Sequence, residues 1–127
     1  MRTRAGWIAG LLLVGAVAGC SEPKFYPTRG MVRDEVGLLS AGEVRFRPVS
    51  RPDLVASGKI QRDGTFTLST PDRGEGVLQG DVQAAVIAAE GGPRIAKRYG
   101  DYSTADLNFT IRPRDENYFI LEVRRGP

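Results

Sequence analysis

Apolar and polar residues alternate in short runs along most of the chain, and glycine, proline and aspartate separate these runs. Residues 44–47 alternate two apolar side chains with two arginines, which is typical of a strand with one buried face. The segments 58–61 and 65–68 flank Asp63-Gly64, a pair that favours a hairpin turn. The same pattern predicts four further strands, at about 30–33, 82–87, 107–111 and 118–123.

These strands predict an all-β fold rather than a mixed one. In the segment 82–87, Val82, Ala84 and Val86 fall on one face of the expected strand. No interval long enough for a helix carries apolar residues at helical spacing. About seven short strands separated by turns indicate an immunoglobulin-like β-sandwich in a single domain.

The N-terminus has the pattern of an export signal. A basic start with Arg2 and Arg4 precedes residues 5–18, which are 14 uncharged and mostly apolar residues. This stretch is shorter than the roughly 20 residues that span a bilayer as a helix, but it fits the apolar region of a signal peptide. It ends in Val17, Ala18, Gly19 and Cys20, which resembles a bacterial lipobox with Cys20 as the lipidated residue. The alternatives are an uncleaved anchor and a conventional signal with a chance cysteine.

These boundaries divide the chain into a signal peptide (1–19), a lipidated tether (20–27) and a β-sandwich domain (28–127). Two prolines in the tether favour an extended chain outside regular structure. Removal of the signal lowers the basic residues from 18 to 16 against 15 acidic ones, and the formal charge from +3 to +1. This charge gives no reason to expect nucleic-acid binding. With its one cysteine acylated, the chain has no thiol left for a disulfide.

The order of short motifs along the mature chain is similar to that of a known family. The motifs are Thr28-Arg29-Gly30-Met31-Val32, Gly42-Glu43-Val44-Arg45-Phe46-Arg47-Pro48, Asp63-Gly64-Thr65-Phe66-Thr67-Leu68, Gly80-Asp81-Val82-Gln83-Ala84-Ala85-Val86 and Ile95-Ala96-Lys97-Arg98-Tyr99. They resemble the small transthyretin-like, carboxypeptidase-regulatory-like lipoproteins of planctomycete bacteria. Val82 stands where that family favours an aromatic residue, and Ala96 stands where it has proline. The resemblance implies a seven-stranded transthyretin-like sandwich outside the cytoplasm, and it implies no enzyme.

The residue content argues against the common kinds of catalytic and metal site. The chain has no histidine, which excludes a Ser-His-Asp triad and the usual zinc and copper ligand sets. The adjacent carboxylates Asp34-Glu35 and Asp115-Glu116 fall in predicted turns and do not form a predicted acid–base pair. Asp63, Asp72 and Asp81 lie near loops, where carboxylates suit calcium, but no loop has the density of an EF-hand. We therefore expect no enzyme, no cofactor and no metal.

Arginine is the more suggestive residue type, with 15 arginines against 3 lysines. The candidate binding surface lies in the long irregular stretch 91–106 and consists of Arg94, Lys97, Arg98, Tyr99 and Tyr102. Arginine beside exposed tyrosine binds carboxylates, phosphates or sugar rings by forked hydrogen bonds and stacking. The alternative is that these arginines are ordinary solvent-facing charges that protect sheet edges.

The sequence thus predicts a membrane-anchored lipoprotein of the cell envelope. Ser21 after the lipidated cysteine favours the outer membrane, facing the periplasm or the cell surface. The expected function is non-enzymatic protein binding or assembly, through an exposed sheet edge or the stretch 91–106. The alternative function is carbohydrate or peptidoglycan binding by the arginine and tyrosine residues of that stretch.

Overall fold

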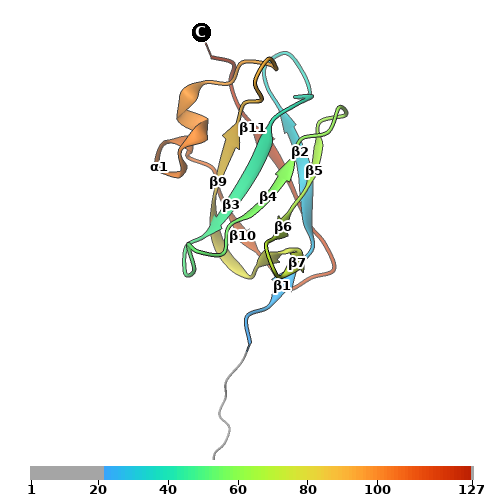
Figure 1. Cartoon of the computed structure of the whole chain (residues 1–127), viewed down its shortest axis with the longest axis vertical. Helices are drawn as coiled ribbons and strands as arrows, with labels where there is room; N and C mark the ends of the chain where they lie inside the picture. The colour runs from blue at the N-terminus through green and yellow to red at the C-terminus, as the bar shows by residue number, and fades with distance from the viewer. Residues whose placement is uncertain (1–21, 127) are drawn as a thin grey trace, which may run out of the picture.

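The computed structural model describes residues 22–126, which fold into short strands and one brief helical segment (Figure 1). The strands are β1 (Phe25–Tyr26), β2 (Thr28–Arg33), β3 (Glu43–Pro48), β4 (Ala56–Lys59), β5 (Thr65–Thr67), β6 (Ser69–Thr70), β7 (Gly74–Glu75), β8 (Val77–Leu78), β9 (Gly80–Ile87), β10 (Asn108–Ile111) and β11 (Asn117–Glu122). The helical segment contains η2 (Lys97–Gly100) and α1 (Tyr102–Ala105). Each predicted strand is present, and the structure adds the two-residue strands β1, β6, β7 and β8.

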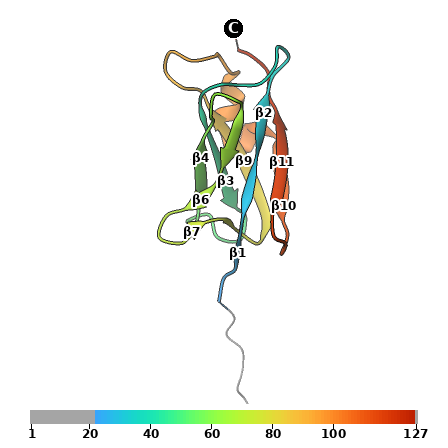
Figure 2. The ribbon, with the colours of Figure 1, turned by 90° about the vertical axis from the view of Figure 1, so that its right-hand side faces the viewer.

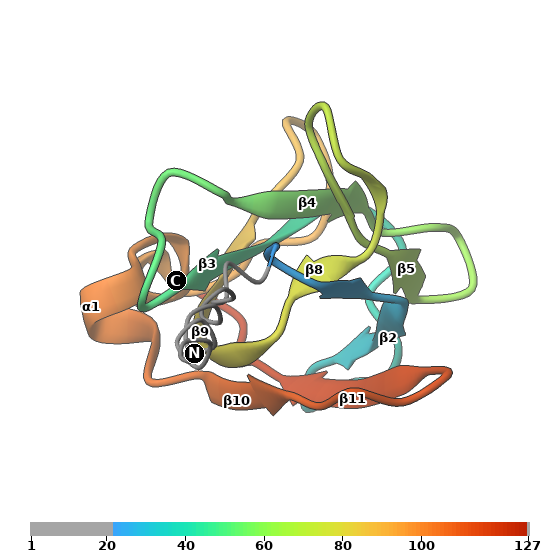
Figure 3. The ribbon, with the colours of Figure 1, turned by 90° about the horizontal axis from the view of Figure 1, so that it is seen from below.

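Two sheets face each other, which confirms the all-β sandwich (Figure 2). The larger sheet has six strands in the order β10-β9-β3-β4-β6-β7, and the smaller has three in the order β11-β2-β5. Strands β1 and β8 form a separate pair that crosses one end of the sandwich (Figure 3). The long strands of the larger sheet are antiparallel, whereas β2 and β11 are parallel.

The core lies between the sheets and contains four phenylalanines. Phe46 and Phe109 come from the larger sheet and stack at 5.5 Å between ring centroids. Phe119 of the smaller sheet lies 4.8 Å from the Phe109 ring, and Phe66 lies 6.4 Å from that of Phe46. Tilted and offset ring pairs at these distances are favourable beyond their buried area. The aromatic cluster therefore joins the two sheets.

Close contact between β2 and β11 depends on Gly30. Its backbone leaves no space for a side chain, because a Cβ there would lie 1.9 Å from the carbonyl oxygen of Phe119. The register pairs Thr28 with Asn117 and Arg33 with Glu122 over the full length of both strands. Any side chain at position 30 would push these strands apart.

The predicted hairpin at Asp63-Gly64 is only partly correct. The turn forms, since Gly64 has φ = 85° and the Asp63 carboxylate accepts a hydrogen bond from the Thr65 N–H at 3.1 Å. The strands on either side of it then join different sheets: β4 pairs with β3 and β6, whereas β5 pairs with β2. Buried Leu68 separates β5 from β6, where the chain crosses from the smaller sheet to the larger one. The turn is thus a connection between layers.

The prediction that the tether stays outside regular structure is wrong for Phe25 and Tyr26. These residues form β1 and pair with Leu78 and Val77 of β8. The Gln79 N–H also donates to the Lys24 carbonyl at 3.0 Å. The sandwich has β1 at one end and the C-terminal segment at the other (Figure 1). We call these the tether end and the far end.

Candidate functional site

Residues 91–106 connect β9 to β10 and were expected to be irregular. That expectation is wrong for 97–105, which form η2 and α1 against β9. Asp101 caps α1, because its carboxylate accepts hydrogen bonds from the N–H and hydroxyl of Ser103 at 2.9 and 2.8 Å. Asp106 ends the helix in the left-handed region, at φ = 57°. The segment packs against β9, in which Ala85 is 1% exposed.

The structure contradicts the prediction that Tyr99 is exposed. Tyr99 is 3% exposed and belongs to the core. The Arg98 guanidinium lies 4.2 Å from the centroid of the Tyr99 ring, and Arg98 Nη2 donates a hydrogen bond to the Tyr99 hydroxyl at 2.7 Å. Arg98 Nη1 also donates to the Thr104 and Ala105 carbonyls at 3.4 and 3.5 Å. Arg98 and Tyr99 therefore fix η2 and α1 to each other and to the core. Their side chains have a structural role in this segment.

Tyr102 is separated from the other predicted residues and packs on β3. The Arg47 guanidinium lies 4.2 Å from the centroid of the Tyr102 ring, and Arg47 Nη2 donates to Gln83 Oε1 at 2.9 Å. Burial raises the pKa of the Tyr102 hydroxyl above its usual range, and the nearby charges of Arg45 and Arg47 oppose this rise. The contact attaches α1 to the outer face of the larger sheet. Sequence reasoning placed Arg45 and Arg47 on one face but missed their tyrosine neighbour.

Arg94 and Lys97 are the two predicted residues that the structure brings together in an open site. They line a hollow of about 620 Å³ whose apolar part is formed by Ala88, Ala89 and Ile95. Both residues are exposed, and within residues 22–126 neither pairs with a carboxylate. A second hollow of about 330 Å³ shares Ala88 and Ala89 and extends toward Lys59. We call the first of these the Arg94–Lys97 hollow. It lies at the far end of the sandwich, and its two cations suit an anionic ligand.

The outer edge of β11 is a second surface with open binding groups. The N–H groups of Asn117 and Val123 donate to Pro27 and Arg33 carbonyls on the β2 side. Because backbone groups alternate in direction along a strand, those of Tyr118, Ile120 and Glu122 point away from β2. No strand within residues 22–126 pairs with this edge. The open edge can therefore accept a further strand.

Large apolar side chains stand next to this edge on the outer face of the smaller sheet. Tyr118 is 43% exposed and Ile120 is 46% exposed. Salt bridges flank them: Arg29 pairs with Glu116, and Arg33 Nε donates to Glu122 Oε2 at 3.0 Å. We call the outward groups of β11 and these two side chains the β11 edge. The alternating pattern of 118–123 predicts the strand, but it carries no signal for its position at the edge of a sheet.

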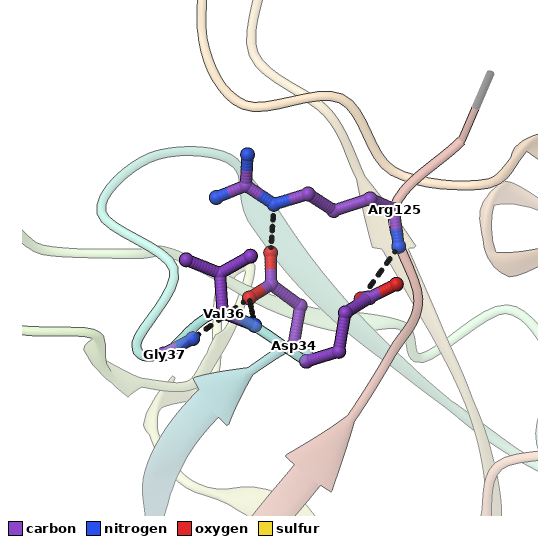
Figure 4. A network of polar contacts seen from close by, with 5 residues as sticks. Asp34, Val36, Gly37 and Arg125 are labelled. Carbon is purple, nitrogen blue, oxygen red and sulfur yellow. Dashed lines mark hydrogen bonds and ion pairs between the residues drawn. The ribbon is translucent and has the colours of Figure 1, made fainter.

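The carboxylates of Asp34 and Glu35 are occupied in a network with the C-terminal segment (Figure 4). Asp34 Oδ1 accepts hydrogen bonds from the N–H groups of Val36 and Gly37, and its Oδ2 accepts one from Arg125 Nε at 2.6 Å. Glu35 Oε1 accepts one from the Arg125 N–H at 3.0 Å. The two residues therefore fasten the loop after β2 to the end of the chain.

The aspartates considered for calcium are not brought together. Asp63 caps its own turn, and Asp81 accepts a hydrogen bond from the Thr110 hydroxyl at 2.8 Å. Asp72 is exposed, with φ = 66°. Among residues 22–126, no three histidine, cysteine or carboxylate side chains are grouped as a metal site would require.

Val17, Ala18, Gly19 and Cys20 lie outside the described residues, so the lipidation site stays a prediction. In the part of the chain that the structure describes, no helix is both long and apolar enough to span a bilayer. Comparisons with protein-family models, with curated proteins and with solved structures match nothing to this chain.

Proposed function

We propose that this protein is a membrane-anchored lipoprotein of the cell envelope that binds another protein and catalyses no reaction. The signal-like N-terminus and the lipobox at 17–20 support a lipid anchor on Cys20 and a location outside the cytoplasm. Ser21 supports the outer membrane, with the domain facing the periplasm or the cell surface. The resemblance to transthyretin-like lipoproteins supports the same proposal, because the all-β sandwich is the architecture that it implies.

The observation that carries this proposal is the β11 edge. Natural sheets protect long edges with lysine, proline, bulges or inward-pointing charges. β11 presents exposed Tyr118 and Ile120 beside the outward backbone groups of Tyr118, Ile120 and Glu122, and no strand among residues 22–126 pairs with those groups. The charges of Arg29 and Glu122 lie beside this edge but leave Ile120 46% exposed. An extended segment of a partner can add to such an edge by backbone hydrogen bonds, with its side chains packing on the exposed apolar pair. The partner is therefore expected to supply an extended strand with at least one apolar side chain facing Ile120.

Site-specific cross-linking in living cells tests this proposal. A photoreactive amino acid at position 118 is expected to capture a distinct envelope protein. The matched control places it at Thr67, an exposed residue of β5 at the opposite edge of the same sheet. We expect capture from position 118 alone, and its loss in the Cys20→Ala variant. Equal capture from both positions, or adducts only between copies of this chain, would contradict the proposal.

Binding of an anionic glycan, including peptidoglycan, is the second candidate function. The Arg94–Lys97 hollow favours it, since two cations without carboxylate partners among residues 22–126 line one concave surface. Tyr99 is buried and Tyr102 already contacts the Arg47 guanidinium, so we assign this binding to the two cations rather than to stacking on tyrosine. A salt-sensitive pull-down of purified peptidoglycan, lost in Arg94→Ala/Lys97→Ala but kept in Arg62→Ala, would support it. Arg62 is an exposed arginine of the loop between β4 and β5 at the same end of the sandwich.

A further inference from the structure

The short strand β1 reduces the length of free chain between the predicted lipid anchor and the sandwich. Phe25 and Tyr26 pair with β8, and the Lys24 carbonyl accepts a hydrogen bond from Gln79. The tether expected from the sequence runs from 20 to 27, but its second half is thus fixed to the domain. Only residues 21–23 lie between Cys20 and the first residue bonded to the sandwich.

Several side-chain contacts reinforce this attachment. The Thr28 hydroxyl donates to the Tyr26 carbonyl at 3.0 Å, and the Tyr26 side chain packs against the core. The Arg73 guanidinium lies 5.3 Å from the centroid of the Phe25 ring. β1 can approach this closely because residue 76 is glycine: a Cβ there would lie 3.0 Å from the Tyr26 carbonyl oxygen. The attachment therefore involves backbone, core packing and a cation–π contact.

The remaining chain is short compared with the sandwich. Four Cα–Cα steps join Cys20 to Lys24, and at 3.8 Å each they span at most about 15 Å. β9, with 8 residues, spans roughly 23 Å from its first to its last Cα at the usual rise of a strand. A lipid on Cys20 would therefore keep the tether end close to the headgroups, and the far end could not exchange places with it.

We infer that the tether end is the surface that faces the lipid headgroups, and that the far end points away from the bilayer. This inference rests on the lipid anchor of the proposed function. The loop after β3 lies at the tether end and carries Val49, which is 57% exposed. The Arg94–Lys97 hollow lies at the far end, so its cations are held away from anionic headgroups that would otherwise attract them. The β11 edge runs between the two ends and stays accessible from the side.

Energy transfer in proteoliposomes tests this orientation. The full lipidated chain is labelled at a single introduced cysteine, either Val49→Cys at the tether end or Glu90→Cys at the far end. The native Cys20 is acylated and does not react. The acceptor is a headgroup-labelled lipid in vesicles of phosphatidylethanolamine and phosphatidylglycerol. We expect transfer from position 49 to be at least about two-fold stronger, because the ends of β9 are roughly 23 Å apart.

A matched variant with a longer tether separates the effect of the tether from other causes of orientation. Insertion of a flexible Gly-Ser segment of about twelve residues after Ser21 should bring transfer from the two positions close to equal. Equal transfer with the native tether, in protein whose intact mass shows the lipid, would overturn the inference but leave the proposed anchor standing. An intact mass without lipid would overturn the anchor, and the orientation with it.

Discussion

Arg125 and Asp34 form a salt bridge across 91 positions of the sequence, with 2.6 Å between Arg125 Nε and Asp34 Oδ2. The Asp34 side chain is only 1% exposed, whereas that of Arg125 is 43% exposed. The bond therefore connects a covered carboxylate in the loop after β2 to the C-terminal segment. Two backbone N–H groups donate to the other carboxylate oxygen, so the Asp34 carboxylate holds the loop and the chain end together by hydrogen bonds.

The Asp34→Asn variant is expected to lower the free energy of unfolding near neutral pH. Burial raises the pKa of the Asp34 carboxyl, but the hydrogen bonds from Arg125, Val36 and Gly37 outweigh it and hold the pKa below its usual range. A lowered pKa stabilises the fold above the unfolded-state value of about 3.9, and this contribution disappears as pH falls through the folded-state value. Thermal unfolding from pH 7 to pH 2 should show the two proteins converging below about pH 4. A constant difference between them across this range would contradict the assignment.

Truncation of Tyr99 is expected to destabilise the fold strongly. Tyr99→Ala removes a core ring and the hydroxyl that accepts a hydrogen bond from Arg98, and substitutions of this kind cost about 3–5 kcal/mol. Tyr99→Phe keeps the ring and should cost about 1 kcal/mol. Urea unfolding measures both changes. Tyr102→Ala is the comparison, because Tyr102 is half-buried on the outer face of the larger sheet. If Tyr99→Ala lowers the free energy of unfolding no more than Tyr102→Ala does, Tyr99 does not have a core role.

A side chain at position 76 is expected to loosen β1. Gly76 has φ = 124° and a Cβ there would meet the backbone of Tyr26, whereas Gly80 has φ = 120° with nothing within 4 Å. Both Gly76→Ala and Gly80→Ala therefore introduce backbone strain at a positive φ. Only Gly76→Ala also places a methyl group against the backbone of Tyr26. A loss of about 1 kcal/mol in the β1 contact should raise the detached population about five-fold. Trypsin cleavage after Lys24, followed by mass spectrometry, reports that population, and equal rates in the two variants would contradict the role of Gly76.

A charge on the β11 edge is expected to block strand addition without unfolding the domain. Ile120→Lys places a solvated cation on a side chain that is already 46% exposed, so stability should change by less than about 0.5 kcal/mol. Cross-linking from position 118 should be lost, because lysine on an edge opposes pairing with another strand. Thr67→Lys is the matched charge at the other edge of the sheet. Retained cross-linking in Ile120→Lys would place the contact elsewhere.

Alternation in the sequence was sufficient to locate the long strands and one inner face. Val82, Ala84 and Val86 are all buried as their spacing predicts. Ala85 on the opposite face is buried too, in the strand that η2 and α1 contact, and a two-residue alternation does not predict this burial. The strands β1 and β8 were missed since two residues are too few to show alternation. Their pairing depends on packing between distant parts of the chain.

Composition also predicted the candidate surface only in part. Arg94 and Lys97 do share a hollow, but Tyr99 is buried, exposed Arg98 is bonded to the Tyr99 hydroxyl, and Tyr102 contacts Arg47. Five residues within nine positions cannot all face one direction when the chain passes through a turn of 3-10 helix and a turn of α-helix. Proximity in the sequence indicated one cluster, but the short helical turns separate its residues into three groups. The Asp101-x-Ser103 capping pattern was a local signal that could have revealed this helix.

The parallel pairing of β2 with β11 joins the first long strand of the domain to the last, for example Arg33 to Glu122 across 89 positions. The smaller sheet therefore lacks its edge strand until residues 117–122 have been synthesised and delivered. A chain that emerges from its N-terminus keeps β2 without this neighbour throughout that time, and folds that depend on such distant pairings form slowly. The export that we propose for this chain would require it to cross a membrane unfolded, and late closure of the smaller sheet is compatible with that proposal, because the native sandwich cannot be completed before residues 117–122 are in place.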